Sequence, residues 1–266
     1  MSGHIPGNNS RNGDLVFECA GNGEPVVFLH GFGLDSRMWA PQFEALQSTF
    51  RVIRYDIRGF GRSPLPSHAP YAHEDDLNAL LTSLDAAPAH VVGLSMGGRI
   101  ALRFAAAYPG SVRSLVLSDS AVDGQDWSSE WLTRWNGMSE VARGGQLAEA
   151  KRQWLEHPLF DPARAHPPVV SLLTRMVEDY SGWHWLNDDT VRVPVPPSVE
   201  RLGEIRAPSL VITGSRDLQD FQRIADFLAQ NLPAARRIFI PDSGHMTNLE
   251  EPQAFNAALR GFFAAK

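Results

Sequence analysis

The segment Gly93-Leu94-Ser95-Met96-Gly97 most strongly constrains what this chain can fold into. It ends an apolar run at residues 90–94 and opens an amphipathic stretch, Met96–Ala107. A Gly-x-Ser-x-Gly sequence between a strand and a helix is typical of a strained turn that exposes the serine hydroxyl at the carboxyl end of a sheet. Small residues are expected two positions either side of the serine, because side chains would collide there. Ser95 is therefore a candidate nucleophile, with an ordinary strand-to-helix turn as the alternative.

Composition narrows the class of protein. The 266 residues are 43% hydrophobic and 20% charged, which is ordinary for a globular enzyme. A net charge of −6 without a basic stripe gives no reason to expect nucleic-acid binding. The single cysteine, Cys19, excludes an internal disulfide. No apolar run approaches the ~18 residues of a membrane span, and residues 1–13 lack the apolar block of a secretory signal. We therefore expect a cytoplasmic protein that does not bind membranes.

Short apolar runs alternate with longer amphipathic ones, a pattern typical of a parallel sheet covered by helices. The interval from residue 121 to 200 interrupts this alternation: it has no clear strand, and glycines and prolines separate its helical stretches. We predict one α/β core formed by residues 1–120 and 201–266, with a helical cap inserted at residues 121–200. Strands are predicted at residues 15–20, 25–29, 51–55, 90–94, 112–117, 209–213 and 236–240, and core helices at 37–47, 72–84, 96–107, 218–230 and 250–263.

The insertion is rich in tryptophan. Six of the seven tryptophans of the chain lie in it, namely Trp127, Trp131, Trp135, Trp154, Trp183 and Trp185. The spacing of four residues between the first three predicts a stripe along one helical face. Such a stripe either packs the insertion onto the core or lines a cavity above Ser95, and all six residues are candidates for a substrate pocket. An aromatic cap would exclude water and favour apolar groups.

A serine is a poor nucleophile until a base takes its proton and a third group orients that base. His245 directly follows the last predicted strand, which places it at the same sheet edge as Ser95. Two carboxylates, Asp217 and Asp119, each follow a predicted strand and compete for the third role. We favour Asp217, because it gives the chain order Ser, Asp, His that accompanies this motif. Asp119 would then cap the turn into the insertion.

The reaction also needs backbone donors for a developing oxyanion. The N–H of Met96 directly follows the nucleophile at a helix N-terminus, and the N–H of Phe32 lies in a loop after the strand at residues 25–29. Glycines on both sides of Phe32 let this loop bend toward the site, and His30 is expected to hold the loop in place. No histidine or cysteine spacing suggests a metal, so no metal or organic cofactor is expected.

Together these segments resemble the α/β-hydrolase fold superfamily along nearly the whole chain. The resemblance implies an eight-stranded, mostly parallel sheet flanked by helices, with a helical cap inserted after the sixth strand. It also implies a catalytic triad of Ser95, Asp217 and His245. The matching segments are His30-Gly31-Phe32-Gly33, Asp56 to Ser63, Gly93 to Gly98, Thr213 to Asp217 and Ser243-Gly244-His245.

Within that superfamily the chain is most similar to small bacterial carboxylesterases and enol-lactone hydrolases, where Gly-Leu-Ser-Met-Gly-Gly is a common elbow. We expect a serine hydrolase that cleaves a small carboxylic ester or lactone through an acyl-enzyme. The alternatives are a carbon–carbon bond hydrolase, a cofactor-free perhydrolase, or a small-ligand receptor that retains the triad. The sequence does not predict the oligomeric state.

The charge of the insertion bears on the substrate. Residues 121–200 hold twelve acidic and seven basic side chains, a balance of −5. This cap offers no long-range attraction to a strongly anionic substrate. Neutral or weakly charged substrates are therefore favoured, unless an inward-pointing arginine such as Arg134 or Arg175 binds a carboxylate locally.

Overall fold

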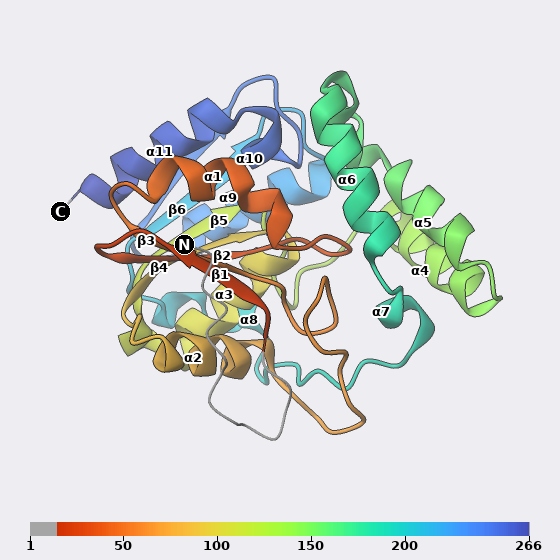
Figure 1. Ribbon diagram of the computed structural model, residues 1–266, viewed down its shortest axis with the longest axis horizontal. Coiled ribbons are helices and arrows are strands. Elements are labelled where there is room, and N and C mark those ends of the chain that lie inside the picture. The colour runs from red at the N-terminus through yellow and green to blue at the C-terminus, as the bar shows by residue number, and fades with distance from the viewer. Residues whose placement is uncertain (1–14, 266) are drawn as a thin grey trace.

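The computed structural model describes residues 15–265 as a sheet with helices on both faces (Figure 1). The prediction that residues 1–13 carry no secretory signal concerns residues outside this range. The strands are β1 (Phe17–Ala20), β2 (Pro25–Leu29), β3 (Arg51–Tyr55), β4 (Ala89–Leu94), β5 (Val112–Ser118), β6 (Ser209–Gly214) and β7 (Ala235–Ile240). The α-helices are α1 (Ala40–Leu46), α2 (His73–Ser83), α3 (Met96–Ala107), α4 (Ser129–Arg143), α5 (Leu147–Leu155), α6 (Pro167–Asp179), α7 (Trp183–Leu186), α8 (Ser198–Arg201), α9 (Gln219–Asn231), α10 (Thr247–Glu250) and α11 (Pro252–Ala264). Short 3-10 helices lie at Ser36–Trp39, Pro109–Ser111, Pro158–Phe160, Pro162–Ala165 and Leu202–Glu204.

The strand order explains where a ligand can bind. The order is β1-β3-β2-β4-β5-β6-β7, and only β1 runs antiparallel to its neighbour. After β2 the chain places β3 on one side of that strand and β4 on the other, so the order reverses between β2 and β4. Open α/β sheets bind ligands at the carboxyl ends of the strands beside such a reversal. The loop with Phe32 leaves β2 there, and Ser95 follows β4 directly.

The number of strands corrects one expectation. The resemblance implied eight strands with the cap after the sixth, whereas residues 15–265 contain a seven-stranded sheet with the insertion after β5. Only two described residues precede β1, which is too short a segment for another strand. The seven strands match the seven apolar runs predicted from periodicity. Central strands such as β4 and β6 are buried along their whole length, as expected for parallel strands covered on both faces.

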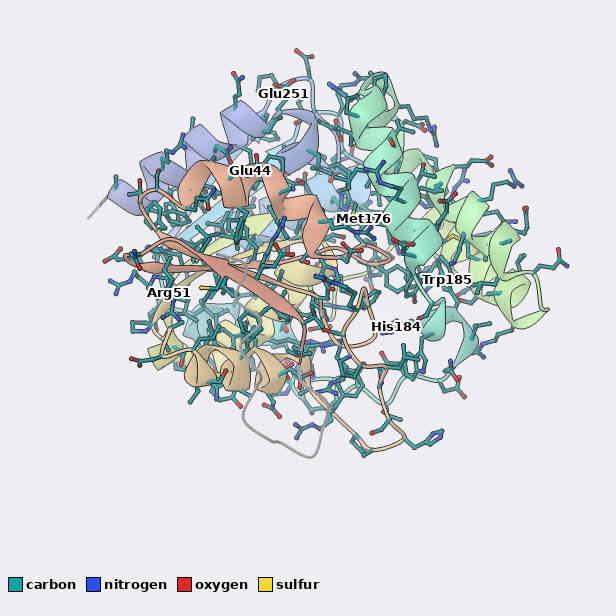
Figure 2. All side chains as sticks on the ribbon, in the orientation of Figure 1. Glu44, Arg51, Met176, His184, Trp185 and Glu251 are labelled. Carbon is teal, nitrogen blue, oxygen red and sulfur yellow. The ribbon has the colours of Figure 1, made fainter. Side chains whose placement is uncertain are left out.

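Helices α1 and α11 pack together on one face of the sheet, and α2, α3 and α8 lie on the other (Figure 1). Helices α4 to α7 lie together at one side of the core, on the right in Figure 1. Figure 2 labels Met176, His184 and Trp185 where α6 and α7 approach the core. Helix α8, at the end of the insertion, packs on α3 of the core. None of the helices between residues 15 and 265 has the length and apolar character that a bilayer crossing requires.

Candidate active site

The turn at Ser95 is strained and firmly anchored. Its φ of +56° lies in a region that a residue other than glycine rarely adopts. The Ser95 N–H donates to the Ser118 carbonyl at 3.0 Å, and the Ser95 carbonyl accepts from Ala121 N at 3.1 Å. A Cβ atom on Gly93 would overlap the carbonyl of Gly97. The glycines therefore have the steric reason that the sequence predicted.

Gly97 also brings the loop after β2 against the elbow. A Cβ atom there would overlap the carbonyls of Leu29 and His30, so the two backbones touch. The imidazole of His30 holds this loop, because its Nε2 accepts from the Ile57 N–H at 2.9 Å. Among residues 15–265, the N–H groups of Phe32 and Met96 have no hydrogen-bond acceptor. Both backbone donors predicted for an oxyanion are thus available beside Ser95.

His245 and Asp217 form a buried hydrogen-bonded pair. Nδ1 of His245 lies 3.0 Å from Oδ2 of Asp217, while Nε2 has no partner in the described part of the chain. Ser95 and His245 line a common space of about 10 Å³, although Ser95 Oγ and His245 Nε2 are not hydrogen-bonded. Catalytic hydrogen bonds are often long before substrate binds. The Phe221 ring packs against the imidazole, with ring centres 4.3 Å apart.

Burial sets the protonation of this pair. It lowers the pKa of His245 to about 4, so the imidazole is neutral near pH 7 and its Nε2 can accept a proton. Burial raises the pKa of Asp217, and the Leu218 N–H opposes that shift by donating to its carboxylate at 2.7 Å. A neutral imidazole oriented by a carboxylate is the arrangement a general base requires.

Asp119, the alternative to Asp217, makes no hydrogen bond to His245. Its carboxyl group is fully buried and accepts from the Gly214 N–H at 2.9 Å and from the hydroxyl groups of Ser118 and Thr247. It ties the end of β5 to the end of β6 and does not cap the turn into the insertion. Burial raises the pKa of Asp119, and the nearby charge of Asp217 raises it further.

Asp119, Asp217 and His245 also form the one carboxylate–imidazole group among residues 15–265 whose ligand atoms are close enough to hold a cation, all within 4.8 Å of one another. A cation at His245 Nδ1 would have to replace the hydrogen bond to Asp217. The remaining oxygens already accept from N–H and hydroxyl donors. This donor set fits proton handling better than metal binding, and the absence of a metal stays a prediction.

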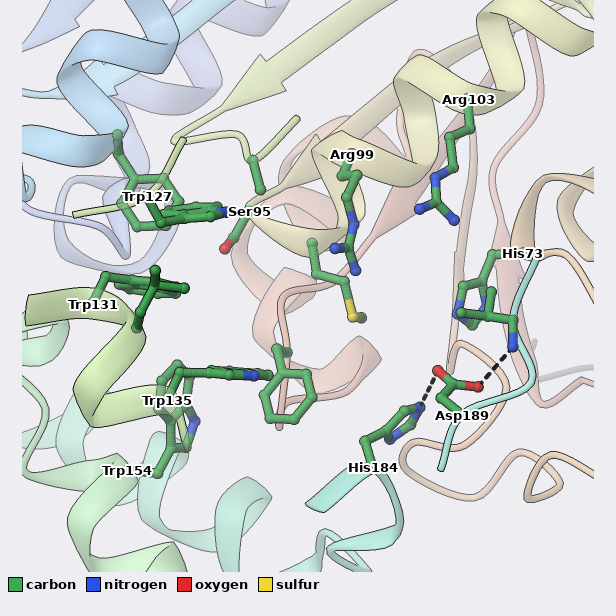
Figure 3. Close-up of a pocket in the computed structure, with 16 residues that line it drawn as sticks. His73, Ser95, Arg99, Arg103, Trp127, Trp131, Trp135, Trp154, His184 and Asp189 are labelled. Atoms are coloured by element: carbon green, nitrogen blue, oxygen red, sulfur yellow. Dashed lines mark hydrogen bonds and ion pairs between the residues drawn. The ribbon is translucent and has the colours of Figure 1, made fainter. Parts of the chain in front are cut away.

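A cavity of about 360 Å³ opens beside Ser95 and extends between core and insertion (Figure 3). One end is aromatic and the other polar, with Ser95 and Arg99 between them in Figure 3. The aromatic end includes Phe32, Trp127, Trp131, Trp135, Trp154 and Phe221, and the polar end includes Arg103, His73, His184 and Asp189.

Four of the six predicted tryptophans line this cavity. Trp127, Trp131 and Trp135 stack with ring centres 4.7 and 6.3 Å apart, so the predicted stripe exists. Trp127 nevertheless precedes α4, which begins after its cap residue Ser128. The stripe therefore continues past the helix end and does not belong to one helix. Phe32 packs on both Trp135 and Trp154, which joins the insertion to the loop after β2.

The prediction of a pocket role is wrong for Trp183 and Trp185, which do not line the cavity. Trp185 is completely buried against Phe32 and Tyr180, with ring centres 5.7 and 5.3 Å apart. Successive side chains of a helix point in directions about 100° apart. In the short helix α7, His184 faces the cavity, and its two tryptophan neighbours point elsewhere.

Sequence reasoning did not identify the polar end of the cavity. The sequence spacing could have identified Arg99 as a cavity residue, because residues four apart on a helix share a face and Ser95 is the N-cap of α3. No sequence pattern predicts that His73 and His184 line the same cavity, since they come from segments far apart in the chain. An isolated bridge between Tyr71 and Val191 brings these segments together. Arg134 and Arg175, the arginines considered from the sequence, do not line the cavity.

Comparison with known proteins agrees with the fold that the sequence resembles. Residues 24–252 match a family model described as alpha/beta hydrolase fold. The protein named "Putative non-heme bromoperoxidase BpoC" from Mycobacterium tuberculosis is 30% identical over 95% of this chain and 98% of its own. A 3-oxoadipate enol-lactonase from Acinetobacter baylyi is 28% identical over 91% of this chain and 89% of its own. The structure of a thermophilic esterase from Thermogutta terrifontis superposes with a TM-score of 0.77 at 28% identity, covering 94% of this chain and 92% of that one.

Proposed function

The chain belongs to the alpha/beta hydrolase fold family, and on this basis we propose that it is a serine hydrolase that cleaves a small carboxylic ester or lactone. The observation that carries the proposal is the buried His245–Asp217 pair: Nε2 of His245 has no hydrogen-bond partner in the described residues, and His245 and Ser95 line the same small space. The names of the enol-lactonase and esterase relatives support this class of substrate. A cytoplasmic location remains a prediction.

In the proposed reaction His245 accepts the proton of Ser95 while the serine oxygen attacks the substrate carbonyl. Asp217 keeps the imidazole oriented and stabilises its positive charge. The N–H groups of Phe32 and Met96 donate to the tetrahedral oxyanion; losing one such donor typically costs about 3–4 kcal/mol of transition-state stabilisation. His245 then protonates the leaving alcohol, and water activated by the same imidazole releases the acid.

The proposal is tested by mass spectrometry of the intact protein after treatment with a serine-directed fluorophosphonate. We expect one phosphonyl group on the wild-type protein and none on Ser95→Ala. The same substitution should lower kcat on a hydrolysed ester by about 10⁴-fold or more. Ser83→Ala, which removes an exposed hydroxyl on α2, is the matched control and should keep both properties. Labelling at another residue, or full activity of Ser95→Ala, would exclude this mechanism.

A panel of esters and lactones separates the enzyme from the receptor alternative. Turnover at ~1–10³ s⁻¹ on some member of the panel is expected of an enzyme. Rates far below this range on every member, with retained ligand binding, would instead support a receptor.

A perhydrolase is the second candidate, favoured by the name of the bromoperoxidase relative. The acyl group on Ser95 would then pass to hydrogen peroxide, giving a peroxycarboxylic acid and the free serine hydroxyl. Hydrolysis and perhydrolysis share the acyl-enzyme and differ only in the acceptor. Peracid formation from an ester in the presence of hydrogen peroxide, measured against hydrolysis of the same ester, decides between them.

A further inference from the structure

Arg99 presents to the cavity a cation whose side chain makes no hydrogen bond within residues 15–265. It lies on α3, one helical turn after Ser95, and lines the space between the aromatic and polar ends (Figure 3). Among residues 15–265 its buried Nε has no hydrogen-bond partner. About 39% of the side chain is accessible, which leaves the rest of the guanidinium free to meet a ligand. A buried polar atom such as this Nε usually has an acceptor.

The nearest carboxylate, Asp123, is committed to another arginine. Its two oxygens accept from Nη2 and Nε of Arg103 at 2.6 and 2.7 Å, and Oδ2 also accepts from the Ser198 hydroxyl at 2.9 Å. The closest approach of Asp123 to Arg99 is 3.9 Å, between Oδ1 and Nε. Arg103 therefore takes up most of the negative charge of Asp123.

The other carboxylate of the polar end, Asp189, is also engaged. One oxygen accepts from the Tyr71 hydroxyl at 2.9 Å and from the Val191 N–H at 3.0 Å. The second oxygen faces Nε2 of His184 at 4.0 Å. No ion pair joins Asp189 to Arg99 in the described residues. A ligand anion would therefore sit on the Arg99 side of this end, away from the carboxylate.

The two histidines of the polar end add hydrogen-bonding atoms without adding charge. Burial lowers the pKa of His73 and lowers that of His184 to about 4, so both rings are neutral near pH 7. Nδ1 of His73 and Nε2 of His184 have no hydrogen-bond partner in the described chain. Neutral imidazoles beside Arg99 can complete the hydrogen bonds of a bound oxyacid group.

We propose that Arg99 binds a carboxylate of the substrate, so that the preferred substrates are esters or lactones carrying a carboxylate a few bonds from the scissile carbonyl. This inference rests on the proposed function of Ser95. Ser95 and Arg99 line the same cavity, and residues one turn apart on a helix have Cα atoms about 6 Å apart along the axis, so a substrate with a short spacer can reach both. The planar guanidinium suits two parallel hydrogen bonds to a carboxylate.

The proposal reverses the preference for neutral substrates that the charge of the insertion suggested. That negative charge belongs largely to exposed acidic side chains such as Glu140 and Asp188. Of the two arginines considered from the sequence, Arg134 pairs with Glu130, and Arg175 is exposed and bonds to the Ser171 hydroxyl. Long-range charge governs the approach of a substrate, whereas a partly buried cation in the cavity selects what stays bound. Burial and the neighbouring Arg103 lower the pKa of Arg99, a shift that a bound anion would oppose.

The test compares matched esters with and without a carboxylate. One pair is mono-4-nitrophenyl glutarate and 4-nitrophenyl valerate, which differ on the acyl side. The other is 4-acetoxybenzoate and its methyl ester, which differ on the alcohol side. The readout is the ratio of kcat/KM for the charged ester to kcat/KM for the neutral one within each variant, so a general loss of activity cancels. Charge-assisted hydrogen bonds of ~1.5–3 kcal/mol correspond to about 10- to 100-fold.

We expect Arg99→Gln to lower this ratio about 10- to 100-fold in at least one pair, and Arg99→Lys to lower it less. Arg175→Gln, which removes the same charge from the surface of the insertion, should leave the ratio at the wild-type value. An unchanged ratio in both pairs for Arg99→Gln would overturn the proposal.

A binding measurement keeps the proposal testable if Arg99→Gln does not fold. Calorimetry on Ser95→Ala should show monomethyl glutarate binding at least about tenfold more tightly than dimethyl glutarate. Equal affinities would overturn the role of Arg99. Hydrolysis of these esters by Ser95→Ala would instead refute the proposed serine mechanism, so the two failures are distinguishable.

Discussion

The carboxyl groups of Asp119 and Asp217 lie beside the same imidazole, with one oxygen of each and one nitrogen of His245 all within 4.8 Å of one another. Two buried negative charges at this separation would repel each other by roughly 3 kcal/mol at an effective dielectric constant of 20. One carboxyl group should therefore hold a proton. The partners of Asp217, His245 and the Leu218 N–H, donate to it, whereas the hydroxyl groups of Ser118 and Thr247 beside Asp119 can also accept a proton. The charge of Asp217 also raises the pKa of Asp119. We assign the proton to Asp119.

Substituting each carboxyl group by its amide tests this assignment. Asp217→Asn should lower kcat by about 10⁴-fold, because an amide no longer stabilises the correct tautomer of His245 or its positive charge. Asp119→Asn should stay within about tenfold of wild type, because the amide resembles a neutral carboxylic acid. The measurement is kcat on one neutral ester for both variants. Equal losses, or a larger loss in Asp119→Asn, would make Asp119 the orienting carboxylate.

The buried imidazole predicts how activity depends on pH. Protonation of His245 removes the lone pair that accepts the serine proton, and burial lowers its pKa to about 4. The kcat/KM for a neutral ester should therefore rise with pH in the acidic range, with a midpoint below 6.5, and be level from there to pH 8. Intrinsic fluorescence at each pH shows whether the protein is still folded. A midpoint at or above pH 7 in folded protein would contradict the burial argument.

The framework of the site was predictable because its residues follow strands. Ser95, Asp217 and His245 each come shortly after a short apolar run, and parallel strands bring such positions to one edge. The run predicted at residues 112–117 is observed as Val112–Ser118. Differences of this size at element ends do not move a residue to another edge of the sheet.

The cavity could not be predicted in the same way, because its lining depends on how the insertion packs. His73 and His184 line the same cavity although they come from distant segments, which are joined by an isolated bridge between Tyr71 and Val191. No periodicity in the sequence predicts such a bridge. Trp185 has the same residue type as Trp135 but fills the interior, because its position on α7 turns it toward Tyr180. Tryptophan content thus predicted an aromatic insertion and did not identify which rings face the ligand.

The contact of Gly97 with the loop after β2 gives a prediction about both stability and rate. In Gly97→Ala the new methyl group would overlap the carbonyls of Leu29 and His30, and the loop with Phe32 must move. Forced displacement of packed groups costs about 1–3 kcal/mol of stability, and a displaced oxyanion donor should lower kcat by about 10²-fold. Urea unfolding and ester hydrolysis measure the two effects.

Gly261→Ala is the control for this substitution. Gly261 lies inside α11, and a Cβ atom there would have no neighbour within 4 Å. Alanine in place of glycine in a helix should stabilise the protein by about 0.5–1 kcal/mol without changing kcat. If Gly97→Ala behaved like Gly261→Ala, the loop after β2 would not depend on this contact.

The buried imidazole of His157 should make stability depend on pH. It lies between Trp131 and Trp154, and burial lowers its pKa from 6.5 to about 4. Between these pH values the unfolded chain binds a proton at this position that the folded protein does not. Its contribution to the free energy of unfolding therefore falls as pH falls, by up to about 1.4 kcal/mol per pH unit.

His157→Asn isolates this contribution. Asparagine can still accept the Leu159 N–H that Nδ1 of His157 accepts at 3.1 Å, but it does not titrate. At pH 7 the variant should be less stable than wild type by about 1–3 kcal/mol, because the smaller side chain packs less well. Urea unfolding from pH 7 to pH 4.5 should show this deficit shrinking, because only the wild type loses stability through protonation at this position. A deficit that stays constant over that range would mean that His157 titrates alike in the folded and unfolded states.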